Sequence, residues 1–184
     1  LRVVMKKSAF LFPGQGSQSL QMLEQLAASS PLVGETFAEA SDILGYDLWA
    51  LTQQGPEAQL NETEFTQPAM LAADMSVWRV WQHRGGANPD YLAGHSLGEY
   101  AALVASGVIE YGAAIALVRQ RGRLMQAAVP AEDGGMLVIV GLNHEQVDTL
   151  AKEVSDGEFI LEPANLNAPG QIVLAGHRRL FAPA

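Results

Sequence analysis

The stretch Gly94–Gly98 (GHSLG) constrains the fold more than any other part of this 184-residue sequence. A short apolar run, Tyr91–Ala93, precedes it, and a helical pattern begins at Glu99. Strand, sharp turn and helix form the context that a G-x-S-x-G nucleophile elbow requires. Ser96 would then stand at a helix N-terminus, where backbone amides face incoming negative charge. We therefore interpret Ser96 as a candidate nucleophile; the alternative is an ordinary turn in a chain with 18 glycines.

Composition excludes several other kinds of chemistry. The chain has no cysteine, which excludes disulfides, thiolate catalysis and cysteine-based metal sites. Its four histidines show none of the spacings of zinc sites, so no metal is expected. A net charge of −9 argues against a nucleic-acid partner, because phosphate binding needs a basic face. We find no secretory signal and no apolar window long enough to span a membrane, and we expect a soluble, cytoplasmic protein.

The N-terminal part predicts the opening of an α/β unit. Ser8–Phe12 is a short apolar strand, the loop Pro13–Gln18 follows it, and a helical pattern that includes Leu20 and Leu23 comes next. The loop lacks the G-x-G-x-x-G and Walker patterns of nucleotide sites. Gln15 lies between two glycines, which can leave its backbone N–H accessible to a ligand. A plain connection between strand and helix explains the same residues.

Helical periodicity dominates the next hundred residues. The predicted helices span Pro31–Gly45, Asp47–Leu51, Thr66 to the Gly85–Gly86 pair, a small apolar helix after Ser96 that ends at Gly107, and Tyr111–Ala127. We expect the helix after Ser96 to be buried and the polar segment Gly55–Glu64 to be a surface loop. The large apolar residues of the helix from Thr66 are expected in the core: Leu71, Met75, Trp78 and Trp81.

Arg121 falls at the edge of an apolar stripe on the predicted helix Tyr111–Ala127. Arg119 and Arg123, which form an i, i+4 pair, point to the other side. An arginine drawn toward apolar surroundings needs a carboxylate or phosphate partner, because an unpaired buried charge is costly. From these residues alone, that partner is either a group of this protein or an anionic substrate.

A boundary is predicted at Pro130–Gly135, which divides the chain into residues 1–129 and 130–184. Beyond it the pattern changes to strand, helix, strand, strand. These elements are predicted at Met136–Val140, His144–Val154, Phe159–Ala164 and Gln171–Ala175, with the last two joined by the loop 165–170. This order is the first half of a ferredoxin-like unit. The last residues, 178–184, contain no helix able to cover the sheet.

A nucleophilic serine needs a base, normally a histidine within hydrogen-bond reach. His95 should diverge from its neighbour across the turn, and His83 and His144 are predicted to face solvent. His177 is the remaining candidate. In α/β serine enzymes with an elbow the histidine follows the serine in the chain, and we expect it to lie beyond the last residue of this sequence.

Five segments together resemble malonyl-CoA:acyl-carrier-protein transacylases of fatty-acid synthesis. They follow the family's order and spacing from Ser8 to His177. The segments are Phe12–Gln18 (FPGQGSQ), Thr66–Ala69 (TQPA), Gly94–Tyr100 (GHSLGEY), Val118–Met125 (VRQRGRLM) and Asn165–Gln171 (NLNAPGQ).

The resemblance implies an α/β fold: an α/β-hydrolase-like large subdomain with a parallel sheet, interrupted by a ferredoxin-like (βαββ) small one. Residues 1–129 would be the N-terminal part of the first, and residues 130–184 an incomplete copy of the second. By position, Ser96 matches the nucleophile that accepts the malonyl group as an ester, and the backbone amides of Gln15 and Leu97 match the oxyanion hole. Arg121 matches the arginine that holds the malonyl carboxylate.

Further substrate-binding candidates follow from the same resemblance. Three of them match segments near the family's cleft: Gln67, Asn165 and Asn167. His95, which stands in the elbow, is a further substrate-binding candidate. The implied partners are malonyl-CoA and an acidic acyl carrier protein, which this −9 chain must meet through a local basic patch. No cofactor is expected, and the intact protein should be a monomer. The alternatives are a serine esterase or other hydrolase, and an inactive fragment or binding module because the catalytic histidine is absent.

Overall fold

Strands β1 (Ala9–Phe12) and β2 (Tyr91–Gly94) pair in parallel, with Phe12 opposite Gly94. The two strands therefore end at the same edge of the sheet, and each is followed there by a loop. Ligands of α/β folds gather at such carboxyl ends. The parallel pairing confirms the α/β class expected from the sequence.

The computed structural model describes residues 7–128 and 133–184. The chain divides into two compact units, Leu1–Met125 and Gln126–Ala184. The predicted boundary Pro130–Gly135 lies partly outside the described residues, and Gly134 and Gly135 already belong to a strand. The domain limits 1–129 and 130–184 stay a prediction.

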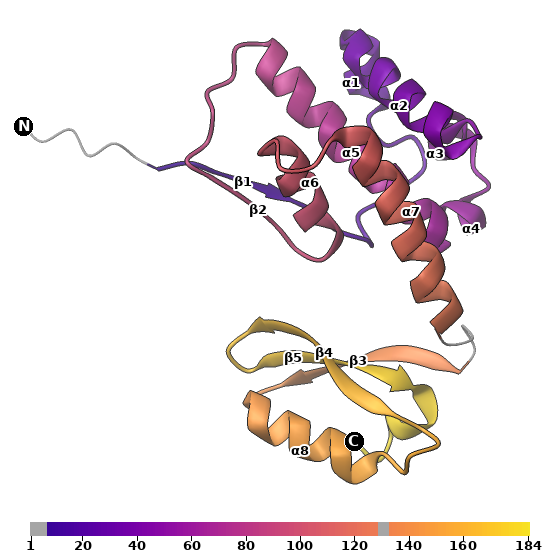
Figure 1. The fold of residues 1–184 in the computed structure, drawn as a ribbon, viewed down its shortest axis with the longest axis vertical. Helices are drawn as coiled ribbons and strands as arrows, with labels where there is room; N and C mark the ends of the chain where they lie inside the picture. Colours follow the sequence, from indigo (N-terminus) through magenta and orange to yellow (C-terminus); the bar gives the residue numbers. More distant parts are fainter. Residues whose placement is uncertain (1–6, 129–132) are drawn as a thin grey trace, which may run out of the picture. The chain divides into compact units, whose positions relative to one another are not determined.

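In the view of Figure 1, the helices of the first unit lie mainly above and to the right of its two parallel strands. Helix α5 forms its core, with thirteen buried residues, and packs against α2 and α6. Pro31 opens α2, where a missing N–H costs nothing, and Gly45 ends it in a left-handed conformation. The helices are α1 (Glu24–Ser29), α2 (Pro31–Leu44), α3 (Leu48–Gln54), α4 (Glu57–Leu60), α5 (Thr63–His83), α6 (Leu97–Ala105) and α7 (Tyr111–Ala128).

The prediction of a surface loop at Gly55–Glu64 was wrong. This segment contains α4 and the start of α5, and Leu60 is completely buried in the core. Helix α5 begins three residues before the predicted Thr66, so Pro68 lies inside it. A proline is commonest at the first position of a helix, which favoured the later start. The hydroxyl of Thr66 donates to the Leu60 carbonyl and ties the two helices together.

Three other expectations also needed correction. The helix predicted around Leu20 and Leu23 forms only from Glu24, because Gln21 and Leu23 both have φ 63°, which interrupts a right-handed helix. Helix α6 is buried on one side only, at Leu97, Gly98 and Ala101. Trp81, which was expected in the core, is 41% exposed.

The second unit is a three-stranded antiparallel sheet covered by one helix. Its strands are β3 (Gly134–Val140), β4 (Leu161–Ala168) and β5 (Gln171–His177), in the order β3-β5-β4, and its helix is α8 (His144–Val154). The order and connections are those of the first half of a ferredoxin-like unit, as predicted. Strand β4 includes residues 165–168, which were expected in a loop, because they continue the pairing with β5. A 3₁₀ helix, Arg178–Leu180, follows β5.

Among the described residues, no helix is long and apolar enough to cross a membrane.

Asp74 is the one charged residue of α5 that is buried, with 6% of its surface exposed. Within the described part of the chain, its Oδ2 atom has no hydrogen-bond partner. Burial raises the pKa of its carboxyl from 3.8 to about 7, because the charged form loses its hydration. The protonated form is therefore favoured in the folded chain over a wide range of pH.

This carboxyl should make the first unit less stable as the pH rises from about 4 to about 7. The pKa is higher in the folded than in the unfolded chain, so the stabilisation is complete below pH 3.8 and lost through pH 7. The loss is on the order of 4 kcal/mol at 1.36 kcal/mol for each pKa unit. Urea unfolding at pH 5 and pH 8 measures the part of this loss that falls above pH 5, about 2–3 kcal/mol, and Asp74→Asn should remove this part of the slope. An equal slope in the variant would contradict the assignment.

Candidate active site

The elbow of the sequence is present as a strained turn between β2 and α6. Ser96 has φ 54° and ψ −104°, a combination that is rare for a residue with a side chain. Such outliers cost about 1–3 kcal/mol and cluster at functional sites. The strand, the turn and the helix predicted around Ser96 are confirmed. Because the turn is strained, contacts with the surrounding structure must hold it in this conformation.

Gly94 and Gly98 allow three backbone segments to meet at the elbow. A Cβ on Gly94 would overlap the carbonyl group of Gly98, and a Cβ on Gly98 would overlap the carbonyl oxygen of Phe12. The end of β1, the end of β2 and the first turn of α6 are therefore too close for any side chain. Because these contacts are between backbones, they fix the position of Ser96 relative to the loop after β1.

Arg121 of α7 bridges the elbow and α5. One terminal nitrogen donates to Ser96 Oγ over 2.9 Å, and the other donates to Gln67 Oε1 over 2.8 Å. The guanidinium carbon also lies 5.6 Å from the ring centroid of Tyr100. Among the ion pairs of the described residues, none includes Arg121. This cation is thus half-buried with neutral hydrogen-bond partners.

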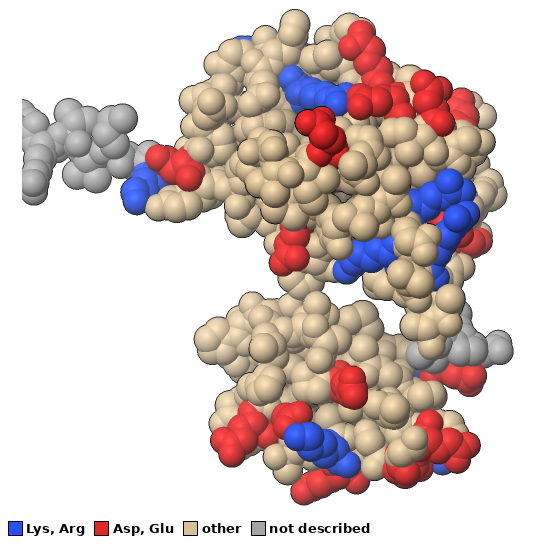
Figure 2. Space-filling model, in the orientation of Figure 1, with Lys and Arg blue, Asp and Glu red and all other residues tan. Residues whose placement is uncertain are grey.

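Glu64 pairs with the other arginines of α7. Its Oε1 lies 3.5 Å from the Nε of Arg119 and 2.6 Å from the Nε of Arg123. On the face shown in Figure 2, Lys and Arg side chains gather over α7, although the chain as a whole is acidic. The local charge around α7 is therefore opposite in sign to the net charge.

Gln67 lies in the interior of the first unit, with 0% of its surface exposed. Its Oε1 accepts from Arg121, and its Nε2 donates to the sulfur of Met125 over 3.2 Å. The side chain is held at both ends by α7, so it fixes where the guanidinium points. Tyr100 and Met125 were not identified from the sequence, although both stand in segments that resemble the transacylases.

The two candidate oxyanion donors lie at the same edge of the parallel strands. Leu97 is the first residue of α6, where a backbone N–H has no acceptor within the helix. Gln15 stands in the loop after β1, and its side chain donates to Thr63 Oγ1 over 3.1 Å. Gly16 N–H donates to the Gln18 side chain over 2.8 Å, which shapes this loop.

The remaining candidates divide between the two units. His95 lies in the elbow itself and is exposed. Asn165 and Asn167 lie on β4 of the second unit, the first half-buried and the second exposed. His177 ends β5, where its Nδ1 accepts from the backbone N–H of Ile160 over 3.0 Å. Among the described residues, no three acidic, histidine or cysteine side chains converge closely enough to hold a metal ion.

Comparison with known sequences decides the family. The profile of the family described as "Acyl transferase domain" matches residues 9–179, which include the elbow, Arg121 and most of the second unit.

This chain belongs to the acyl transferase domain family.

Two relatives of this chain carry the same name. The malonyl CoA-acyl carrier protein transacylase of Salmonella typhimurium is 55% identical over 174 residues, and that of Haemophilus influenzae is 52% identical over 173. The alignments cover 95% and 94% of this chain but 56% and 55% of the relatives. This chain thus spans a little more than half the length of these relatives.

Solved structures agree with the fold. The malonyl CoA-acyl carrier protein transacylase of Coxiella burnetii superposes with a TM-score of 0.89 at 48% identity, covering 97% of this chain and 57% of that one. A malonyl-transacylase solved in complex with a type II polyketide-synthase acyl-carrier protein has a TM-score of 0.87 at 56% identity, with the same coverage of both chains. The α/β fold of this chain, with its small ferredoxin-like part, is therefore shared with these two structures.

Proposed function

We propose that this chain carries the nucleophile and the acyl-binding arginine of a malonyl transferase in fatty-acid biosynthesis. The observation that carries the proposal is the 2.9 Å hydrogen bond from Arg121, a cation with neutral partners, to Ser96 Oγ. A group that binds a carboxylate is thus next to the nucleophile, as a dicarboxylic acyl group requires. The names of the relatives support the same substrate, malonyl-CoA, and the same acceptor, an acyl carrier protein.

The reaction consists of two half-reactions, which proceed through the same malonyl ester on Ser96. Ser96 Oγ attacks the thioester carbonyl of malonyl-CoA; a C–O bond forms, the C–S bond breaks, and the serine proton leaves with the CoA thiol by way of a general base. The phosphopantetheine thiol of the carrier protein then attacks the ester, its proton returns to Ser96, and the malonyl thioester is released. We expect the base to be a histidine outside the sequence described here. No metal or redox cofactor enters this sequence of steps.

Arg121 would distinguish malonyl from acetyl. A guanidinium binds a carboxylate with two parallel hydrogen bonds, which are shorter and stronger than its bonds to neutral oxygens. Gln67, which is buried and bonded to Arg121, would fix the orientation of the guanidinium. An acetyl group offers no anion, so binding it leaves a desolvated arginine without a charge partner.

The backbone amides of Gln15 and Leu97 would stabilise the oxyanion that forms in both halves. Removing one donor from such a site typically costs about 2.7–4 kcal/mol. His95, Asn165 and Asn167 remain candidates for contacts with the rest of the substrate, and the arginines over α7 for contacts with an acidic carrier protein (Figure 2). A cytoplasmic location and a monomeric intact protein belong to the same proposal, as do the domain limits 1–129 and 130–184.

Competitive labelling tests this function. The intact protein carrying this sequence is incubated with equal amounts of malonyl-CoA and acetyl-CoA, quenched in acid, and mapped by peptide mass spectrometry. We expect a malonyl ester on Ser96 in large excess over an acetyl ester. Arg121→Ala should lower the malonyl-to-acetyl ratio by roughly 100-fold, because the charge partner of the malonyl carboxylate is lost.

Arg123→Ala is the matched control, because Arg123 lies on the same helix and pairs with Glu64. It should keep the preference of the unmodified protein. An unchanged ratio in Arg121→Ala would contradict the role of this arginine, and an adduct away from Ser96 would contradict the nucleophile. Release of free malonate faster than the ester accumulates would favour the hydrolase alternative.

A further inference from the structure

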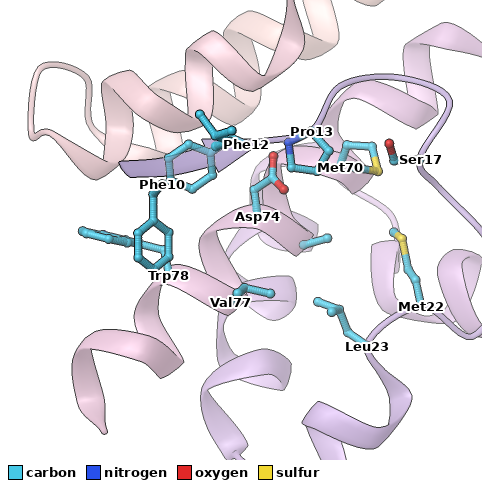
Figure 3. Close-up of a pocket in the computed structure, with 12 residues that line it drawn as sticks. Phe10, Phe12, Pro13, Ser17, Met22, Leu23, Met70, Asp74, Val77 and Trp78 are labelled. Carbon is cyan, nitrogen blue, oxygen red and sulfur yellow. The ribbon is translucent and has the colours of Figure 1, made fainter. Parts of the chain in front are cut away.

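A cavity of about 330 Å³ lies between β1, the segment that follows it, and α5 (Figure 3). Its walls are mostly apolar, with Phe10 and Phe12 from β1, Met70 and Trp78 from α5, and Met22 from the turn before α1. The rings of Phe10 and Trp78 meet edge to face, with centroids 5.3 Å apart. The volume is at the small end of the range for ligand pockets, about 300–1,000 Å³.

Asp74 is the one ionisable residue among those that line this cavity. Figure 3 shows its carboxyl group extending from α5 toward Phe12 and Pro13. The residue is 94% buried, as its exposed fraction of 6% implies, and its Oδ2 atom is unpartnered within the described residues. A buried acceptor without a donor costs free energy, and a carboxylate costs more than a neutral group. The sequence carries a signal of this feature, because Asp74 stands four residues from both Met70 and Trp78.

The acyl site does not share this cavity. Ser96, Arg121 and Gln67 are absent from its lining, and of the loop that carries Gln15 only the flanking Pro13 and Ser17 reach it. The unsatisfied carboxyl therefore has no use in the transfer reaction proposed above. Desolvation is the cause of its raised pKa, with no contribution from a neighbouring cation. The residues that line the cavity therefore include one acid, Asp74, and no positively charged side chain to pair with it.

We propose that this cavity binds a small apolar molecule that carries one primary ammonium group. The ammonium donates a hydrogen bond to Asp74 Oδ2, and the apolar body lies against the aromatic rings of Phe10, Phe12 and Trp78. An ammonium cation fits both features of this site, the unpaired carboxylate and the aromatic walls, better than water does. It supplies the charge that a buried carboxylate needs, and aromatic faces attract it further. The volume suits an arylalkylamine of one ring.

Binding of 2-phenylethylamine tests the proposal. The titration is done at about pH 7.5, above the pKa of about 7 of the Asp74 carboxyl, so that the carboxylate is present. Calorimetry of the intact protein should then show saturation at one site. Two-dimensional NMR should place the change at the indole N–H of Trp78 and not at that of Trp49, which lies on α3. The uncharged analogue 2-phenylethanol should bind at least about 10-fold more weakly, since it lacks the charge that pairs with the carboxylate.

Two variants complete the test. Asp74→Asn should weaken the amine by at least about 10-fold, and Asp42→Asn, which removes an exposed acid of α2, should leave its affinity unchanged. Val77→Phe narrows the cavity from its exposed side without touching the acid, and it should also weaken binding. No saturation, equal binding to Asp74→Asn, or equal binding of the amine and the alcohol would overturn the proposal. None of these outcomes depends on acyl transfer.

Discussion

Ser96→Ala and Ser96→Gly are both expected to abolish labelling by malonyl-CoA, yet the glycine variant should be the more stable of the two by about 1 kcal/mol. Loss of the nucleophile lowers the rate of such enzymes by a factor on the order of 10⁶. Both variants lose the same hydrogen bond to Arg121. They differ in the backbone, because glycine adopts φ 54° and ψ −104° freely and alanine does not.

Urea unfolding of the two variants at one pH measures the difference. The control is Ser106, an exposed serine just after α6 whose φ is −83°. There Ser106→Gly should be no more stable than Ser106→Ala, and both should be labelled normally at Ser96. If Ser96→Ala proved as stable as Ser96→Gly, the turn would not be strained, and persistent labelling of either would remove Ser96 as nucleophile.

Gly98→Ala should destabilise the first unit by about 3 kcal/mol or more and should also suppress labelling of Ser96. The added Cβ would overlap the carbonyl oxygen of Phe12, which belongs to the backbone of β1 and cannot rotate away. Either β1 or the first turn of α6 must shift. Both carry groups of the proposed site, so stability and acyl transfer should fall together.

Gly34→Ala provides the matched control within the same unit. Gly34 lies inside α2, and a Cβ there would have no neighbour within 4 Å. Alanine is the better helix former, so this change should raise the free energy of unfolding by about 0.5–1 kcal/mol. Circular dichroism during urea unfolding measures both variants. A loss below about 1 kcal/mol in Gly98→Ala would show that the elbow can relax, and would contradict the close backbone contact.

Local patterns were sufficient to predict the elements that have strong boundaries. Glycine and proline end or begin α2, and the apolar runs before Pro13 and Gly94 form the two parallel strands. The segment Gly55–Glu64 was missed because its polar composition is that of a loop. Only the packing of Leu60 in the core, where it is completely buried, shows why the chain folds into helix there.

The partner of Arg121 could not be chosen from the sequence. Three arginines occur within five residues of α7, and the acid that pairs with two of them is more than fifty residues away. Glu64 and Gln67 stand three residues apart on α5, nearly one helical turn. The register between α5 and α7 gives the carboxylate to Arg119 and Arg123 and the amide to Arg121. That register is a tertiary property, which helical periodicity does not contain.

In the proposed reaction, the bond between Arg121 and Ser96 would affect when the serine can react, as well as which substrate it selects. One terminal nitrogen of the guanidinium that would bind a malonyl carboxylate donates to the hydroxyl oxygen of Ser96. A lone pair engaged in that bond is less available for attack. A carboxylate is the stronger acceptor, so its arrival would release the oxygen as it anchors the acyl group. When a thioester without a second carboxylate binds, or when only water is present, Ser96 Oγ would still accept the hydrogen bond from Arg121. Binding of the malonyl carboxylate to Arg121 and release of Ser96 Oγ for attack would then occur in the same step.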